Sequence, residues 1–377
     1  MNQLNFKELP FYIKFTFKLL MLLLLAVLLI QGQGIIVPFI FSILLSILLL
    51  PFVNFLVNKL LFPKSLAVLT AVILSLAVIG SIIYFFSHQI AGFLKDIPSI
   101  RDHLQAHYQT LQSWLQTRFN ISTEQQSDLF DRATSNVKNS GSEVIGQTVF
   151  TITHTLFFIV MIAIYTFLIL VYKHMIREFI IEVFDKEHEQ EVKEVLLESK
   201  GIVQKYMVGL ITEMGIIAVL NTSVLLFLGI KYAIFLGILT AILNIIPYIG
   251  IISGIIFTSL ITLTTSTHLS DIAWIIIWFE VIHFFDSNFL MPRIVGSKVK
   301  INALVTILGV VIAGTLLGLP GIFLALPTIA ILKTIFDRIE DLKPWGKLMG
   351  GDSTAEKGRI ARKLEKIRLK RQQKIAS

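Results

Sequence analysis

The chain is 377 residues long, and 55% of its residues are hydrophobic while only 15% are charged. Together with a mean hydropathy of +0.77, this composition predicts a membrane-embedded protein and excludes a soluble globular enzyme. The absence of cysteine excludes a disulfide framework, a thiolate metal site and a cysteine nucleophile.

The net charge of +8 lies in the C-terminal tail. Residues 343–377 contain 11 Lys and Arg against 3 Asp and Glu, whereas residues 1–342 contain 22 of each kind. Behind a membrane domain, such a tail is more typical of a cytoplasmic segment that faces lipid headgroups than of nucleic-acid binding. We therefore expect the lipid bilayer, and no nucleic acid, among the partners.

Apolar stretches of about 20 residues, long enough to cross a bilayer, follow one another along the chain. The N-terminus lacks the cleavage site of a removable signal, so we expect the first stretch to be retained. The predicted full spans cover residues 11–30, 35–57, 65–86, 149–172, 207–228 and 272–290.

Two further apolar blocks, residues 232–265 and 303–336, are interrupted near their centres. The interrupting residues are Asn244, Pro247, Tyr248 and Gly250 in the first block, and Gly318, Pro320 and Gly321 in the second. Each half has about 15 residues, which reaches the bilayer midplane but does not cross. Both blocks are therefore predicted to be helical hairpins.

Basic residues in the connecting loops predict the orientation. Lys59 and Lys64 follow the second span, six basic residues lie within residues 173–205, and Arg293 follows the sixth span between Pro292 and Gly296. If these loops are cytoplasmic, each interrupted block returns to the side that it entered, and residues 87–148 lie outside. Two full crossings per block would satisfy the charges equally well.

The resulting fold class is an all-α polytopic membrane protein with six full spans, two broken helical hairpins and helical extramembrane segments. Span five with the first hairpin and span six with the second enter from opposite sides, which predicts an inverted-topology repeat. Many secondary transporters build their substrate site from such repeats. Chance similarity between Leu- and Gly-rich segments is the competing explanation.

This organisation divides the chain into five segments. They are an N-terminal scaffold of three spans (1–86), an extracytoplasmic helical cap (87–148), the fourth span with charged cytoplasmic helices (149–206), a transport unit with the repeats and hairpins (207–342), and a basic cytoplasmic tail (343–377).

Polar residues inside the apolar segments are the candidates for a substrate or ion pathway, because an intramembrane charge costs about 2.5–3.5 kcal/mol on insertion scales. These candidates are Glu213, Asn221, Asn244, Glu280, His283, Asp286 and Asn288. Glu280, His283 and Asp286 recur every three residues, so Glu280 and His283 are close enough to share a proton. A structural hydrogen bond between helices is the alternative for these two, and a solvated carboxylate is the alternative for Glu213.

Enzyme signatures are absent from the sequence, which holds no phosphate-binding loop, no His-Glu-x-x-His zinc helix and no Gly-x-Ser-x-Gly elbow. We therefore expect neither enzymatic activity nor a cofactor or metal. Without a motor domain, the energy source is expected to be an ion gradient, or none.

Several short motifs resemble those of the AI-2 exporter family of bacterial inner-membrane proteins, and the resemblance covers essentially the whole chain. They are Leu228-Gly229, Tyr232-Ala233, Ile246-Pro247-Tyr248-Ile249-Gly250, Pro292-Arg293-Ile294-Val295-Gly296 and the segment from Gly318 to Pro327. Two departures are Ile251 and the segment Ile301-Asn302-Ala303, at or near places where that family commonly has proline.

The resemblance implies a multi-pass, homo-oligomeric permease of the bacterial inner membrane, with a pentamer as one form and both termini cytoplasmic. It also implies export of a small polar solute similar to the signal molecule autoinducer-2. The alternative function is a Na⁺(Li⁺)/H⁺ antiporter, in which carboxylates bind a monovalent cation or proton directly. A third hypothesis is a non-transporting membrane scaffold, which has no need of two matched helix breaks.

Overall fold

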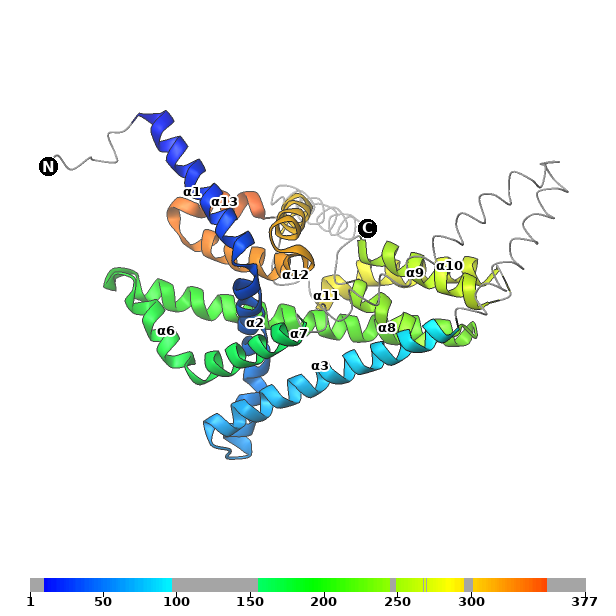
Figure 1. Cartoon of the computed structure of the whole chain (residues 1–377). Helices are drawn as coiled ribbons and strands as arrows, with labels where there is room; N and C mark the ends of the chain where they lie inside the picture. Colours follow the sequence, from blue (N-terminus) through cyan, green and yellow to red (C-terminus); the bar gives the residue numbers. More distant parts are fainter. Residues whose placement is uncertain are drawn as a thin grey trace, which may run out of the picture. The chain divides into compact units, whose positions relative to one another are not determined.

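The computed structural model of the chain describes residues 10–96, 155–244, 249–266, 268, 270–294 and 301–350. All regular elements in these ranges are helices, and no strand occurs among them (Figure 1). The predicted all-helical class is therefore confirmed. Contacts group the chain into two compact units, residues 1–33, 177–206 and 296–377 in the first and residues 34–176 and 207–295 in the second. The five-segment division stays a prediction.

By length and apolar composition, five described helices can cross a membrane, or six if one bent pair forms a single span. The five are α2 (Gln33–Lys59), α3 (Lys64–Lys95), α7 (Glu189–Phe227), α10 (Ser270–Phe285) with the π-helical turn η3 (Asp286–Leu290), and α12 (Ala303–Arg338). The bent pair is the helix Thr155–Val171 followed by α6 (Lys173–Glu182). α1 (Phe11–Gln31) covers the first predicted span.

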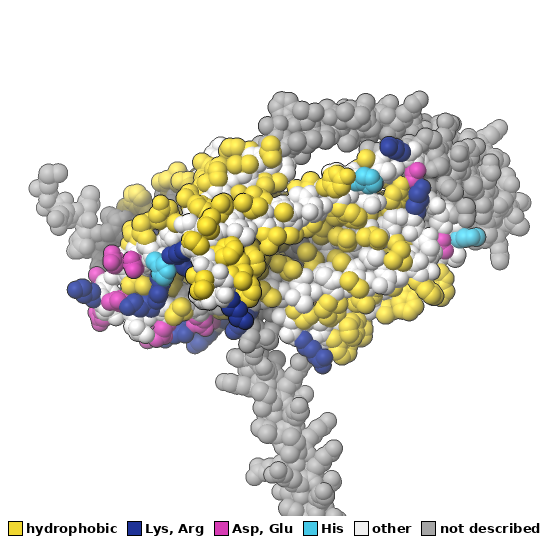
Figure 2. Space-filling model, turned by 90° about the horizontal axis from the view of Figure 1, so that it is seen from below, with side chains coloured by type: hydrophobic (Ala, Val, Ile, Leu, Met, Phe, Trp, Pro, Cys, Tyr) yellow, Lys and Arg dark blue, Asp and Glu magenta, His cyan; other side chains and the backbone are white. Residues whose placement is uncertain are grey.

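Large apolar side chains are exposed along most of these helices. Figure 2 shows such side chains covering much of the described surface on one face. In water a surface of this kind would associate, whereas in a bilayer it is solvated by lipid tails. The protein is accordingly a multi-pass membrane protein.

Within the second unit, α2, α3 and the helix Thr155–Val171 pack around small and β-branched side chains. Ala67, Val68 and Ala71 of α3 are fully buried in this cluster with Val53 of α2. The Ser42 hydroxyl of α2 donates a hydrogen bond to the Ile162 carbonyl at 3.1 Å. Small residues allow such close approach of helices in lipid, where interhelical hydrogen bonds and packing replace the hydrophobic effect.

The helix α7 is longer than the fifth predicted span, because it begins at Glu189 rather than near Met207. Glu189 and Glu191 in its first turn favour the helix start by complementing the positive end of the helix dipole. No proline interrupts the helix, and each of its glycines, Gly201, Gly209 and Gly215, costs only about 1 kcal/mol. A charged segment and an apolar span therefore form one uninterrupted helix.

The first interrupted block forms two packed helices in the second unit, α8 (Ala233–Leu243) and α9 (Ile249–Thr265). A Cβ atom at Gly250 would lie 2.0 Å from the Leu243 carbonyl oxygen, and one at Gly254 would lie 2.4 Å from Thr240 Cγ2. Gly250 faces Leu243, seven residues earlier, and Gly254 faces Thr240, fourteen residues earlier. This order shows that α9 folds back along α8. Two of the predicted tip residues, Pro247 and Tyr248, lie outside the described residues.

The second interrupted block, α12 in the first unit, also folds back on itself. Gly318 has φ 67° and ψ −151°, a conformation that is essentially restricted to glycine, and Pro320 opens the second half where its missing N–H is harmless. A Cβ at Gly309 would lie 2.2 Å from Ile329 Cδ1. In a straight helix these residues would be about 30 Å apart. The 36 residues of α12 thus form two halves that pack against each other rather than one straight helix.

Asn302 ties the beginning of α12 to the short helix α13 (Lys343–Met349) in the same unit. Its side-chain oxygen caps α12 by accepting from the Val305 N–H at 2.9 Å, and its own N–H donates to the Met349 carbonyl at 3.0 Å. Pro292 and Arg293 form the short helix α11 (Met291–Ile294) in the second unit. Gly296, most of the predicted outer cap and the tail beyond residue 350 lie outside the described residues.

We expect Gly321→Ala to destabilise the protein by about 1–3 kcal/mol, because its Cβ would meet the Ala313 carbonyl oxygen across the hairpin at 2.0 Å. The measurement is thermal unfolding of the detergent-solubilised protein. Gly80→Ala is the matched control, since a Cβ there has no neighbour within 4 Å and improves a helix interior. Equal unfolding temperatures for the two variants would contradict the folded-back α12.

Candidate functional site

Three of the predicted pathway residues come together in the second unit, although they are far apart in sequence. Glu213 lies on α7, Asn244 ends α8, and Asp286 opens the π-helical turn η3 after α10. The two acidic side chains are deeply buried, with 7% of Glu213 and 3% of Asp286 exposed. Burial of this degree is rare for carboxyl groups, so each of them requires a partner.

Asp286 has both of the other residues as neighbours. The Asn244 side-chain amide donates a hydrogen bond to Asp286 Oδ2 at 3.1 Å. The carboxyl groups of Glu213 and Asp286 lie close enough to interact with each other. Ile217, Ala241 and Ile282 form a small apolar cluster from the same three helices, which separates the site from the next polar residue on α7.

If both carboxyl groups of the pair were ionised, two of their oxygens would have no hydrogen-bond donor. Glu213 Oε2 and Asp286 Oδ1 have no donor among the described residues. A carboxylate only accepts hydrogen bonds, so two of them in contact repel each other unless a proton or a cation lies between them. The pair is therefore built to hold a positive charge, and Asn244 fixes the orientation of one of its members.

Helical geometry explains why Asp286 is buried while Asn288 is not. The buried face of α10 carries Ile275, Phe279 and Ile282, and Asp286 continues that face by one turn. Asn288 lies two residues further, on nearly the opposite side of the helix, so it is exposed, and its amide donates to the Phe284 carbonyl at 2.8 Å. π-helical insertions such as η3 are frequent at functional sites. The structure does not bring Asn288 to the carboxyl pair.

Glu280 and His283 are placed differently from Asp286. Three-residue spacing rotates successive side chains by about 60° around an α-helix, so Glu280 is exposed while His283 is half-buried. His283 Nε2 lies 3.5 Å from the Ser287 hydroxyl. The described residues offer Glu280 no hydrogen-bond partner, so the expected proton sharing between Glu280 and His283 is not seen. The coupling role predicted for Glu280 stays a prediction.

Asn221 lies two turns beyond Glu213 on the same side of α7 and is 1% exposed. Its Oδ1 atom has no partner in the described part of the chain. The polar residues of α7 are thus separated by the apolar layer around Ile217.

Sequence reasoning missed a buried row of threonines in the first hairpin. Thr240 of α8 and Thr258 and Thr262 of α9 are each at most 1% exposed, and the Thr240 and Thr258 hydroxyls lie 3.4 Å apart. The signal was present in the sequence, because Gly254, Thr258 and Thr262 recur every four residues as small residues do at helix contacts in membranes.

Also missed was a polar cluster that we call the α3 clasp, formed by Asp96, Lys231 and Tyr232. Asp96, just after α3, accepts hydrogen bonds from Lys231 and from the Tyr232 hydroxyl, immediately before α8. The bond from Lys231, followed by that from Tyr232, lowers the pKa of Asp96. Burial, with the bond to Asp96, raises the pKa of Tyr232 to about 12.

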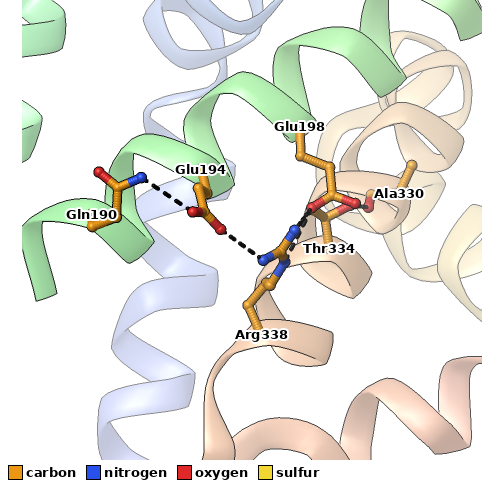
Figure 3. Close-up of polar contacts among 6 residues, drawn as sticks. All are labelled: Gln190, Glu194, Glu198, Ala330, Thr334 and Arg338. Carbon is orange, nitrogen blue, oxygen red and sulfur yellow. Dashed lines mark hydrogen bonds and ion pairs between the residues drawn. The ribbon is translucent and has the colours of Figure 1, made fainter.

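In the first unit, an exposed ion-pair cluster joins the beginning of α7 to the end of α12 (Figure 3). Arg338 donates to Glu198 Oε2 at 2.6 and 3.1 Å and to Glu194 Oε2 at 3.1 Å. Gln190 in turn donates to Glu194 Oε1 at 3.2 Å. Exposed pairs of this kind contribute about 0.2–1 kcal/mol each, so the cluster orients the two helices more than it stabilises them.

The fold and the site together define a polytopic helical membrane protein in which a carboxyl pair is buried beside the C-terminal end of α8, the first helix of a helical hairpin. A family profile described as AI-2E family transporter matches residues 19–341. The chain therefore belongs to the AI-2E family of transporters, and the resemblance noted from its motifs is confirmed.

Individual relatives agree with this assignment, and the names of all three describe them as proposed transport proteins. YueF of Bacillus subtilis (strain 168) is 24% identical over 299 residues, which cover 76% of this chain and 79% of YueF. YrrI of the same organism is 33% identical over 107 residues, covering 28% of this chain and 30% of YrrI. A protein of Borreliella burgdorferi (strain ATCC 35210 / DSM 4680 / CIP 102532 / B31) is 27% identical over 138 residues, covering 34% and 38%.

The α3 clasp predicts a pH dependence at the alkaline end. Because the pKa of Tyr232 is raised from 10.0 to about 12 in the folded protein, its contribution to stability is complete below pH 10 and is lost as the pH rises toward 12. In a titration of tyrosinate absorbance, the difference between wild type and Tyr232→Phe should have its midpoint near pH 12. A midpoint near 10 would show that the clasp is open.

Proposed function

We propose that this protein is a secondary transporter that exports a small polar solute and couples export to proton movement at Glu213 and Asp286. The observation that carries the proposal is the proximity of these two buried carboxyl groups beside the end of α8. Intramembrane ionisable residues that face the protein interior mark ion and substrate pathways by default. The AI-2E family membership supports transport as the activity.

The mechanism follows from the position of Asn244. This residue caps the C-terminal end of α8 and holds Asp286 by a hydrogen bond of 3.1 Å. Any displacement of the α8–α9 hairpin would therefore alter this bond, and a change in the charge of Asp286 would alter the position favoured by the hairpin. Solute movement past the hairpin and proton movement at the carboxyl pair are thereby linked.

For the solute we propose a small polar molecule similar to autoinducer-2, as the family resemblance implies. The export direction, the location in a bacterial inner membrane, the cytoplasmic termini and a homo-oligomeric assembly belong to the same proposal. The inverted repeat likewise stays part of it.

A second candidate function is Na⁺(Li⁺)/H⁺ antiport, and the same carboxyl pair favours it. The unpartnered oxygens of Glu213 and Asp286 are hard ligands of the kind that bind hard cations. A proton and a sodium ion competing for one pair of carboxylates would exchange across the membrane. The two candidates differ in whether proton movement requires sodium or the solute.

The first experiment measures both fluxes in proteoliposomes that contain the purified protein. A trapped pH dye follows proton movement under an imposed sodium or solute gradient, and the retained solute is quantified in the same vesicles. Proton movement driven by autoinducer-2 or another small polar solute supports the exporter, and sodium-driven movement supports the antiporter. If neither gradient moves protons and no solute is released, both candidates fail.

The carboxyl assignment is tested with Glu213→Gln and Asp286→Asn, which keep the shape of the side chains. Each variant should abolish coupled proton movement, because a neutral amide cannot exchange a proton. Glu280→Gln is the matched control, since this carboxyl group lies on α10 but is exposed. Loss of coupling in Glu280→Gln with retention in Asp286→Asn would move the coupling site to the exposed face of α10.

The role of Asn244 predicts a separate effect. Asn244→Ala removes a hydrogen bond to a buried carboxyl group, an interaction worth about 1.5–3 kcal/mol when the partner is charged. We expect solute flux to fall about tenfold or more at an unchanged protein level, as 1.4 kcal/mol corresponds to a factor of ten. Wild-type flux in Asn244→Ala would show that the hydrogen bond between the hairpin and the carboxyl pair is not needed for transport.

A further inference from the structure

α6 changes direction immediately after a helix that is apolar enough to cross the membrane. The helix Thr155–Val171 is followed by one non-helical residue, Tyr172, and α6 then runs at 71° to it. Membrane-spanning helices lie on average about 20° from the bilayer normal. A helix turned by 71° at the end of such a span therefore runs close to the plane of the membrane.

One face of α6 carries an exposed apolar row. The residues of this row lie three or four positions apart along the chain or side by side, which places them on one side of a helix. The row extends one residue past α6 to Val183, whose N–H donates to the Phe179 carbonyl at 3.1 Å. Phe179 and Met175 are 66% and 60% exposed. We call this row the α6 stripe; it consists of Tyr172, Met175, Ile176, Phe179 and Val183.

Apart from Ile180 and Ile181, the remainder of α6 is polar or charged. Lys173 lies beside the stripe on one side and Glu182 on the other, while Arg177, His174 and Glu178 lie toward the far side of the helix. Ile181 is buried and points almost directly away from the stripe. The helix therefore rests on protein with one side and leaves its apolar side uncovered.

The α6 stripe continues the lipid-facing surface of the preceding helix. Leu156, Val160, Ile164 and Leu168 are exposed at four-residue intervals along Thr155–Val171, and Tyr172 is the next member at the same interval. In a membrane these side chains face lipid tails, because they are large, apolar and uncovered. The row that reaches the stripe is thus already a lipid-facing row.

We propose that α6 is an interfacial helix, with its stripe at the boundary between headgroups and acyl chains of the leaflet where Thr155–Val171 ends. Lys173 and Arg177 contact anionic headgroups there. The loop charges predict that this leaflet is the cytoplasmic one. Helices of this type bury their apolar face by about 5–10 Å below the headgroups. The proposal requires only that the protein is inserted in a membrane, so it does not depend on which solute is transported.

The natural absence of cysteine permits a direct test in the full chain. Single cysteines replace Met175 and Phe179 in the stripe and their neighbours His174 and Glu178 as matched controls. Each variant carries a nitroxide label in vesicles of phosphatidylcholine and phosphatidylglycerol. Electron paramagnetic resonance then compares collisions with oxygen, which concentrates in lipid, and with a water-soluble nickel complex.

We expect a higher oxygen-to-nickel accessibility ratio at positions 175 and 179 than at 174 and 178. Equal, water-like ratios at all four positions would place α6 away from the membrane. Shielding of 175 and 179 from both reagents would mean that protein covers the stripe. Either result overturns the inference, whereas the alternation supports it even if one of the variants is poorly folded, because each pair reports separately.

The headgroup contact has its own readout at position 179. In the labelled protein, Lys173→Gln with Arg177→Gln should lower the oxygen-to-nickel ratio in phosphatidylglycerol-containing vesicles and leave it unchanged in phosphatidylcholine alone, because basic side chains are attracted only to the anionic surface. An identical ratio for both proteins in both lipids would remove the two basic residues from the proposal.

Discussion

A bilayer offers no water to an unpaired backbone group, and this constraint governs where the helices of this protein break. In both apolar blocks the helix after the break folds back and packs against the helix before it. At Gly318 the two halves of α12 approach so closely that Gly309 and Gly321 have no room for a side chain. In the first hairpin, Gly250 and Gly254 serve the same close approach between α9 and α8. Glycine therefore allows two helices to approach closely at these contacts, and at Gly318 it also allows a positive φ.

The same constraint concentrates polar side chains beside a break. α8 has 11 residues, about 16 Å of helix, and acidic residues hold it near both ends. Asp96 binds Lys231 and Tyr232 just before the first residue of α8, while Asp286 accepts from Asn244 just after the last. The residues between are apolar or Gly237, apart from Thr240, whose hydroxyl lies 3.4 Å from that of Thr258 on α9. α8 is therefore a short apolar helix with a carboxyl group bound at each end.

Electrostatics at the edges of the membrane orients the remaining helices. The long helix α7 begins with charged turns, and there Glu194 and Glu198 bind Arg338 at the end of α12. Each pair is worth little by itself in water, yet together they determine which ends of α7 and α12 meet. α6 precedes this region with an apolar stripe and a charged side, the composition of a helix that lies on a membrane rather than across it.

Local properties of the sequence were sufficient to predict the helical class, most helix positions and both hairpins. Apolar runs determine which segments enter a membrane, and Gly318 with Pro320 cannot continue a helix, so these features need no knowledge of distant residues. Glu213, Asn244 and Asp286 were likewise identifiable as costly residues in apolar segments. Tertiary structure alone decided that these three meet while Glu280 and Asn288 remain exposed, because packing between helices decides which face of α10 points to the interior. It alone also decided that Asp96 binds Lys231 and that α7 continues unbroken from a charged segment into the membrane. Such pairings join residues from 42 to 135 positions apart, and they depend on packing between helices, which periodicity within one helix does not encode.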